Sequence, residues 1–430
     1  MEDDKRSGSL RRLVASATLD LAPLKASREF RLLFAGQFVT TIGSMVTYVA
    51  VPFQLYRLTR SSLDVGLLSL CEFLPILVMA FVGGALADAI DRRRMVRLTE
   101  AGMCATTAAL LANSLLSHPA VWPLFVVAAV GAGFDALQRP SLEALVPRIV
   151  DKEMLPAAIG VNSVRGQVGQ IAGPPLAGVL IATIGLPSTY LIDVLSFVFS
   201  LGAITAMRSV PPPDDADRVS LRSIAAGMRY AWGRKDLLGT YAIDINAMFF
   251  GMPMALFPQV AARYGGAGAL GLLYAAPAVG SLAVSATSGW VRHVRRHGKA
   301  IAVAAAMWGV AIVGFGLAPS LWLALAGLVV AGGADMVSGL FRMTMWNQTI
   351  PDEFRGRLAG IEMISYTSGP SLGNLEAGVV ESLAGLRTAI VSGGLACVAG
   401  TVVLSALLPT FWRYKAQGAP AGSLSAATEP

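Results

Sequence analysis

The sequence predicts an all-α integral membrane protein with twelve transmembrane helices in two pseudo-symmetric bundles of six. Of its 430 residues, 54% are hydrophobic and only 14% are charged, whereas soluble domains contain roughly 25% charged residues. Twelve spans of about 20 residues each would leave room only for short loops and two small tails. An internal repeat, set out below, divides these spans into two groups of six.

Apolar runs of spanning length, separated by Gly, Pro and charged clusters, mark the spans in chain order. The first six are predicted at residues 30–57, 64–88, 95–117, 121–147, 154–184 and 188–208. The last six are predicted at residues 237–262, 267–291, 299–317, 321–349, 358–383 and 388–409. A polar stretch that begins at Pro211 and an amphipathic segment at 220–235 separate the two groups.

The domain boundaries follow from these spans. We expect a first bundle with a cytoplasmic tail in residues 1–209, a linker in 210–235, a second bundle in 236–411 and a polar tail in 412–430.

The distribution of Lys and Arg predicts the orientation, because positive charge is disfavoured in short external loops. With the N-terminus inside, only four of the 34 fall on the outer side, namely Arg57, Arg60, Arg263 and Arg387. This pattern places both termini in the cytoplasm. The net charge of +7 follows from the same rule and from anionic headgroups, so the expected partner is the lipid bilayer and not nucleic acid.

The chain lacks the motifs of an enzyme or of an ATP-driven pump. It has no phosphate-binding loop and no nucleophile elbow. Its three cysteines, Cys71, Cys104 and Cys397, stand far apart without metal-ligand spacing. We therefore expect no metal and no cofactor, with a proton gradient as the energy source, and a functional monomer.

Glycines repeat between the two halves at constant offsets. Four glycines of the fifth span match four of the eleventh at an offset of 200: Gly160, Gly169, Gly173 and Gly178 with Gly360, Gly369, Gly373 and Gly378. In the second and eighth spans, Gly66 and Gly84 match Gly271 and Gly289. Two homologous halves predict a transporter that rocks around a midplane cavity and exposes it to each side in turn.

Small residues in these spans predict close helix packing. Gly169 and Gly173 lie four residues apart, as do Gly369 and Gly373, so we expect them to bring helices of opposite halves together. Pro174 follows Gly173 and interrupts helix hydrogen bonding, which favours a bend at a moving interface. Static packing without movement is the alternative.

Two motifs resemble those of the major facilitator superfamily. One runs from Gly84 through Asp88 to Asp91, Arg92, Arg93 and Arg94, and resembles the superfamily's signature between the second and third spans. The other, Gly160, Gly169, Gly173, Pro174 and Gly178, resembles the antiporter motif, which implies export. Four segments, residues 24–34, 51–52, 83–88 and 348–357, are similar to the enterobactin exporter family, whose branch includes drug exporters such as macrolide-efflux proteins. This resemblance implies a place in a bacterial inner membrane.

The signature loop is expected to act as a gate. Asp88 would accept N–H groups at a neighbouring helix start and pair with an Arg across the bundle interface, latching the outward-facing state. Ala89 replaces the signature's Arg, so Arg92, Arg93 or Arg94 would supply that charge. For these arginines, membrane topology alone is the alternative.

Four acids inside predicted spans are proton-coupling candidates, because ionisable residues at this depth are costly and usually functional. They are Asp244, Glu72, Asp135 and Asp335. Asp244 and Glu72 come first, since neither has a cation three or four residues away in its helix. Asp135, Arg139 and Glu143 share one face of their span, so we expect Arg139 to pair with these acids along the helix. Asp193 is expected to be structural. Static ion pairs between helices are the alternative.

The substrate face is expected to be aromatic and adaptable. The superfamily architecture implies that the first, fourth, seventh and tenth spans line the cavity. Its candidate residues are Arg139, Phe249, Phe250, Met252, Arg342 and Trp346. These side chains suit a bulky, partly aromatic small molecule, with core packing as the alternative.

The sequence thus predicts a secondary active transporter that uses protons to export an enterobactin-type siderophore or a lipophilic drug. The alternatives are a broad multidrug or macrolide exporter without a role in iron, and a membrane sensor that does not transport.

Overall fold

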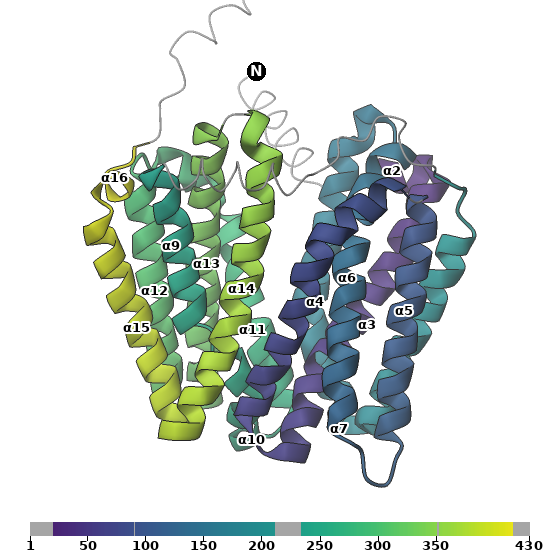
Figure 1. The fold of residues 1–430 in the computed structure, drawn as a ribbon, viewed down its shortest axis with the longest axis horizontal. Coiled ribbons are helices and arrows are strands. Elements are labelled where there is room, and N and C mark those ends of the chain that lie inside the picture. The colour runs from purple at the N-terminus through teal and green to yellow at the C-terminus, as the bar shows by residue number, and fades with distance from the viewer. Residues whose placement is uncertain (1–19, 90, 211–233, 351, 416–430) are drawn as a thin grey trace, which may run out of the picture.

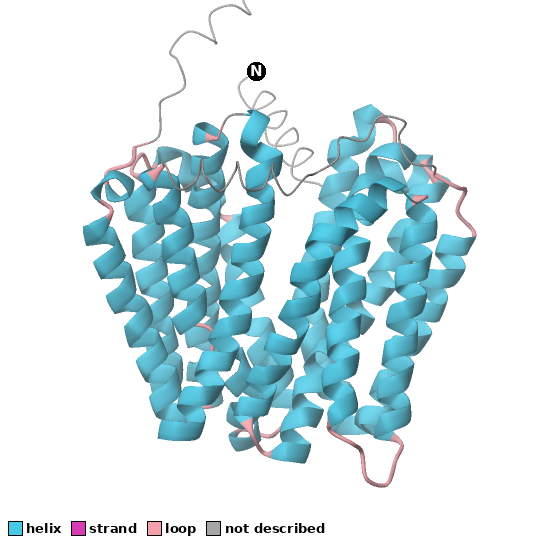
Figure 2. Ribbon diagram, viewed as in Figure 1, coloured by secondary structure: helices cyan, strands magenta, loops and turns pink. Residues whose placement is uncertain are grey.

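The computed structural model describes residues 20–89, 91–210, 234–350 and 352–415, and for 80–89 and 352–365 it describes the backbone alone. All regular secondary structure in these ranges is helical (Figure 2). Within the predicted amphipathic segment, residues 220–233 lie outside the described part, as do most of both predicted tails.

The first half of the chain contains five long helices. In chain order the elements are α2 Ala22–Ala26, α3 Arg28–Thr59, α4 Ser62–Ala89, α5 Arg92–Ser114, α6 Trp122–Ile149, η1 Lys152–Met154 and α7 Leu155–Thr205. Ser27 starts α3, because its Oγ accepts a hydrogen bond from the Phe30 N–H at 3.1 Å. The 51 residues of α7 cover both the fifth and sixth predicted spans, and the break between them is at Gly185, where φ is 78°.

The second half contains more breaks. Its elements are α9 Lys235–Phe250, η2 Met254–Leu256, α10 Phe257–Arg263, α11 Ala267–Ala286, η3 Ser288–His293, α12 His297–Leu317, α13 Leu321–Thr349, α14 Asp352–Ala384, α15 Leu386–Leu407 and α16 Pro409–Trp412. The seventh span, predicted as continuous, is interrupted after Phe250. Pro253 has no N–H to continue the helix, and Trp308 Nε1 donates to the freed Gly251 carbonyl at 2.9 Å.

Eight helical segments of the described chain are long and apolar enough to cross a membrane. One of them, Lys152–Thr205, has 54 residues, more than twice the length that a single crossing needs. The chain is therefore a multi-pass membrane protein.

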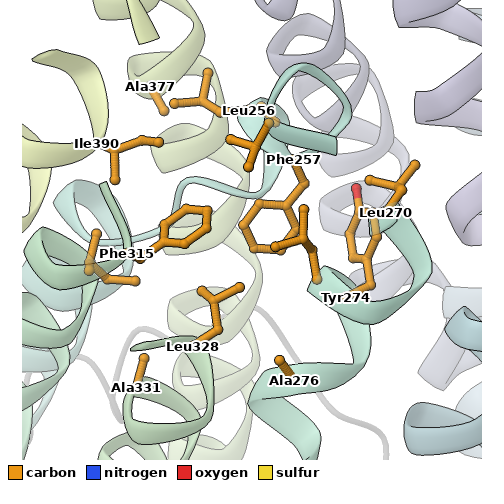
Figure 3. Packing of buried hydrophobic residues seen from close by; sticks show 14 of the residues in the cluster. Leu256, Phe257, Leu270, Tyr274, Ala276, Phe315, Leu328, Ala331, Ala377 and Ile390 are labelled. Carbon is orange, nitrogen blue, oxygen red and sulfur yellow. The ribbon is translucent and has the colours of Figure 1, made fainter. Parts of the chain in front are cut away.

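Aromatic side chains fill part of the core where the second half meets the first. Phe257 packs edge-on against Tyr274 and Phe315, with ring centroids 5.2 and 5.7 Å apart (Figure 3). Phe257 and Leu256 are almost fully buried. This packing fixes the short α10 against α11 and α12.

The two halves meet through two matched helix pairs, α4 with α14 and α7 with α11. The ribbons of α4 and α14 come together at the lower end of Figure 1, opposite α2 and α16. A Cβ on Gly66 would lie 2.6 Å from the Asn374 carbonyl, and one on Gly378 would lie 2.9 Å from that of Ser62. These glycines therefore let backbones of opposite halves touch.

The other pair repeats this arrangement. Gly178 faces the backbone of Ala267, and Gly271 faces that of Pro174. The partner positions of Gly66 and Gly271, Asn374 and Pro174, are themselves 200 residues apart. The contact between the halves thus follows the sequence repeat.

One packing prediction was wrong. Gly169 and Gly173 face Thr41 and Met45 of α3, within their own half. Gly369 likewise faces the Met248 side chain, and Gly373 faces the backbone of Met248 and Phe249, both in α9. Helix spacing alone identifies a close-packed face but not the helix that covers it, so the pairing with the opposite half could not be read from the sequence.

Candidate functional site

A cavity of about 430 Å³ lies where the two halves meet. We call it the junction cavity. Its polar, aromatic and thioether lining includes Tyr48, Glu72, Asp135, Asp193, Met252, Met254, Tyr274 and Asn374. Helices α3, α4, α5, α6 and α7 provide most of the wall. The rest comes from Met252, between α9 and η2, and from η2, α11 and α14.

Among the described residues, three carboxylates line the junction cavity and no Lys, Arg or His does. Asp193 is held in place, because Thr47 and Thr107 donate to Oδ2 and Ser196 donates to Oδ1. Glu72 and Asp135 form no hydrogen bond or ion pair with residues in the described ranges. The cavity therefore has a negative, partly uncompensated lining.

The predicted pairing along α6 is not formed. Among the described ion pairs, none within 4.0 Å joins Arg139 to Asp135 or Glu143. Glu143 is exposed, so water competes with the i, i+4 attraction that the spacing suggests.

Aromatic rings from both halves meet at the cavity. Tyr48 of α3 and Tyr274 of α11 are arranged edge-on with centroids 5.3 Å apart. The Tyr48 hydroxyl donates to Met254 Sδ at 3.7 Å.

Asn374 lines the cavity and contacts both halves of the chain. Its Oδ1 accepts from the Ala255 N–H at 2.9 Å, and its Nδ2 donates to Ser69 Oγ on α4 at 3.2 Å. One side chain of α14 thus links the broken seventh span to the first half of the chain.

A second charged cluster lies within the second half. Arg342 on α13 is only 2% exposed and forms an ion pair with Asp244 on α9, while Asp335 Oδ1 lies 4.0 Å from its Nη2. The Tyr366 ring centroid is 5.5 Å from the guanidinium carbon. Asp244 was predicted as a proton-coupling acid because its own helix holds no cation three or four residues away. Its partner, Arg342, comes from another helix, and residue spacing within one helix does not reveal such a pair.

The predicted substrate residues separate into two groups. Met252 lines the junction cavity, whereas Arg139, Phe249, Phe250, Arg342 and Trp346 do not. Trp346 Nε1 donates to Thr240 Oγ1 at 2.9 Å, and its ring stacks on Tyr241. Trp346 is therefore packed between helices of the second half.

The signature loop is anchored inside the first half. Asp91 caps α5, because its Oδ1 accepts from the Arg94 N–H at 2.8 Å. Arg93 donates to the Ile204 and Thr205 carbonyls at the end of α7, and Arg92 donates to the Ala144 carbonyl. Cations are favoured at these helix ends. Only the backbone of Gly84 and Asp88 is described, so the predicted latch stays a prediction.

One buried acid was missed. Glu100 on α5 is 1% exposed and accepts from Gln37 Nε2 at 2.6 Å, while its Oε2 has no hydrogen-bond partner in the described structure. A lone acid within a predicted span was the available signal.

Comparisons with known proteins agree with a transporter. A family model described as transmembrane secretion effector matches residues 18–418. Proteins named enterobactin exporter EntS, from Citrobacter koseri and Escherichia coli, are each 27% identical over 392 residues, covering 91% of this chain and 93% of theirs.

Solved transporter structures share the fold. A POT family transporter in complex with 5-aminolevulinic acid matches with a TM-score of 0.71 at 11% identity, covering 90% of this chain and 97% of its own. The nucleoside transporter NupG matches with a TM-score of 0.67 at 14% identity, covering 90% and 100%.

Proposed function

Because the chain belongs to the transmembrane secretion effector family of the major facilitator superfamily, we propose that it exports a bulky small molecule by proton-coupled alternating access. The observation that carries this proposal is the junction cavity, where helices of both halves surround the unpaired acids Glu72 and Asp135. Function follows from this site and not from the fold alone.

The proposed architecture has twelve crossings in two bundles of six. Eight segments meet the length and hydropathy criteria on their own. Because Gly185 divides α7 in two, the segment Lys152–Thr205 supplies two crossings. Helices α5, α6 and α14 are each long enough to supply one more.

We place the protein in the bacterial inner membrane with both termini in the cytoplasm, where it acts as a monomer. In this orientation the contacts of Gly66 and Gly378 with the opposite half lie on the outer side. The described conformation would then be closed to the outside. Rocking of the halves about this contact would open it, with the matched helix pairs as the moving surfaces.

Glu72 and Asp135 are the proposed coupling acids. An unpaired carboxylate in a cavity gains or loses a proton as its access to water changes sides. A membrane potential of 100 mV supplies about 2.3 kcal/mol for each proton that moves down it. The cluster of Arg342, Asp244 and Asp335 has charges of both signs and is proposed to hold α9 against α13.

The proposed substrate is a siderophore of the enterobactin type. The curated relatives named above are enterobactin exporters, and this favours a siderophore over a macrolide or another drug. The aromatic and thioether lining of the cavity suits catechol rings. Membership of an exporter family disfavours a sensor that does not transport.

Inside-out vesicles with an acid interior test the proposal. The native chain should accumulate metal-free enterobactin only while the pH gradient is maintained, and a protonophore should abolish this uptake. Uptake that ignores the gradient would contradict proton coupling. Absence of uptake in vesicles that contain folded protein would contradict the proposed substrate.

A further inference from the structure

We propose that the second half binds an anionic phospholipid of the cytoplasmic leaflet in a surface groove between α12, α15 and α16. Six residues define this corner groove: Ala302 and Ala306 of α12, Ser405 and Ala406 of α15, and Trp412 and Arg413 of α16. Its volume is about 450 Å³. Among the described residues, it shares none with the lining of the junction cavity.

The corner groove faces the lipid. Figure 1 shows α15 and α16 at the edge of the second half, and in the proposed orientation α16 lies on the cytoplasmic side. Val303 and Val402, which also line the groove, are 47% and 61% exposed. Exposed apolar side chains of spanning helices contact acyl chains. The alanines of α12 and α15 leave space between these helices, so an acyl chain fits along them.

Polar groups also line the corner groove. Ser405 Oγ is buried and has no hydrogen-bond partner in the described structure, which is uncommon and costly for a hydroxyl. Arg413 is exposed and forms no ion pair with a described residue. Trp412 is 36% exposed, and tryptophan is enriched at the level of the headgroups. The phosphate and ester oxygens of a phospholipid would accept hydrogen bonds from Ser405 and Arg413.

The charge around the groove favours an anionic headgroup. Lys299 is exposed and lies on the same face of α12 as Ala302 and Ala306, three and seven residues further on. Residues 288–334 and 382–415 contain no acid. Each basic residue near the membrane surface strengthens the attraction of anionic lipid by about five-fold.

An acid of α9 approaches this corner from the side. Asp236 acts electrostatically on Tyr414, which follows α16. Its carboxylate is already bound by Arg234, with Nη2 and Oδ2 2.6 Å apart. These two charges cancel, so Lys299 and Arg413 are left to attract an anion.

Photoactivatable lipids test the inference on the full chain in phosphatidylcholine nanodiscs. Two analogues, a phosphatidylglycerol and a phosphatidylcholine, carry the same diazirine-bearing acyl chain and differ in headgroup charge. Peptide mapping by mass spectrometry gives the ratio of their labelling at residues 302–306 and 401–413. The anionic analogue should label these segments at least about five-fold more than the neutral one.

Four variants locate the headgroup and the acyl chain. Arg413→Gln should lower the labelling ratio by about five-fold, whereas Arg413→Lys, which keeps the charge, should stay within about two-fold of native. Ala406→Phe should fill the groove and reduce labelling by both lipids. Lys152→Gln removes an exposed cation of the first half outside the groove and should label as the native chain does. All three positions are exposed, so each variant should unfold at the native midpoint.

Equal labelling by the two lipids would overturn the inference, as would a native ratio in Arg413→Gln or native labelling in Ala406→Phe. Equal losses in Lys152→Gln and Arg413→Gln would show attraction by the general surface charge, which also contradicts a site in this groove. Labelling needs no transport, so failure of enterobactin uptake leaves this test intact.

Discussion

Arg342 and Asp244 form an ion pair that joins α13 to α9, and the two side chains are only 2% and 6% exposed. Desolvation of both charges is costly, so each depends on the other for compensation. This ion pair thus joins two helices of the second half, and no local sequence pattern predicts it.

Breaking this pair should destabilise the fold. Asp244→Asn would leave the Arg342 charge with Asp335 as its nearest described acid, and we expect a loss of about 3–5 kcal/mol in unfolding free energy. The double variant Asp244→Asn/Arg342→Gln should be more stable than Asp244→Asn alone, because the buried Arg342 charge is gone and the remaining acid, Asp335, is 42% exposed. Thermal unfolding in detergent measures both. A double variant less stable than either single variant would contradict this account.

A methyl group at Gly66 should disturb the contact between the halves. In Gly66→Ala the added Cβ would meet the Asn374 carbonyl at 2.6 Å, and overpacking of this kind costs about 1–3 kcal/mol. Gly202→Ala is the matched control, since a Cβ there meets nothing within 4 Å.

Cross-linking reports on this contact. In a background without the native cysteines, Ser69→Cys and Asn374→Cys should form a disulfide across the halves. We expect Gly66→Ala to lower the cross-linked fraction and Gly202→Ala to leave it unchanged. Equal cross-linking in the two variants would show that Gly66 does not set the approach of the halves.

Arg93 should stabilise the contact between α5 and the end of α7, in addition to contributing positive charge that sets the membrane orientation. Arg93→Lys keeps the positive charge but loses the paired donation to the Ile204 and Thr205 carbonyls. We expect a loss of about 1 kcal/mol, since the group is partly exposed, whereas the exposed Arg94→Lys should be neutral. Denaturation midpoints compare the two. Identical midpoints would support topology as the sole role of Arg93.

Substituting Gly185 with any other residue should lower the stability of the fold. Its φ of 78° and ψ of 170° lie in a region open essentially to glycine alone, so Gly185→Ala should lose about 1–3 kcal/mol in stability. Nothing but Pro187 Cδ, at 3.9 Å, is near the added methyl. The cost would therefore come from backbone strain, and Gly202→Ala again serves as the control in thermal unfolding.

The sequence predicted the long helices within a few residues, because apolar length and charged boundaries are local properties. It also located the break at residues 184–188, where Gly185 lies. The break after Phe250 was missed because hydropathy stays high across it, and Trp308, which satisfies the Gly251 carbonyl, is distant in sequence.

Predictions about the site were less complete for the same physical reason. Glu72, Asp135 and Met252 line the junction cavity as residue type and span position suggested. Tyr48 and Tyr274 were not singled out, because their meeting depends on how the halves pack. The partners of Asp244 and of the paired glycines likewise depend on helix packing.

The central claim is that proton movement and substrate movement are coupled at an acid in the junction cavity. Proteoliposomes with a pH dye inside, no initial pH gradient and a clamped membrane potential would receive metal-free enterobactin outside. The account predicts that enterobactin entry drives protons out and makes the lumen alkaline, and that Glu72→Gln abolishes or greatly reduces this pH change. Enterobactin entry through the native chain without any pH change would contradict it.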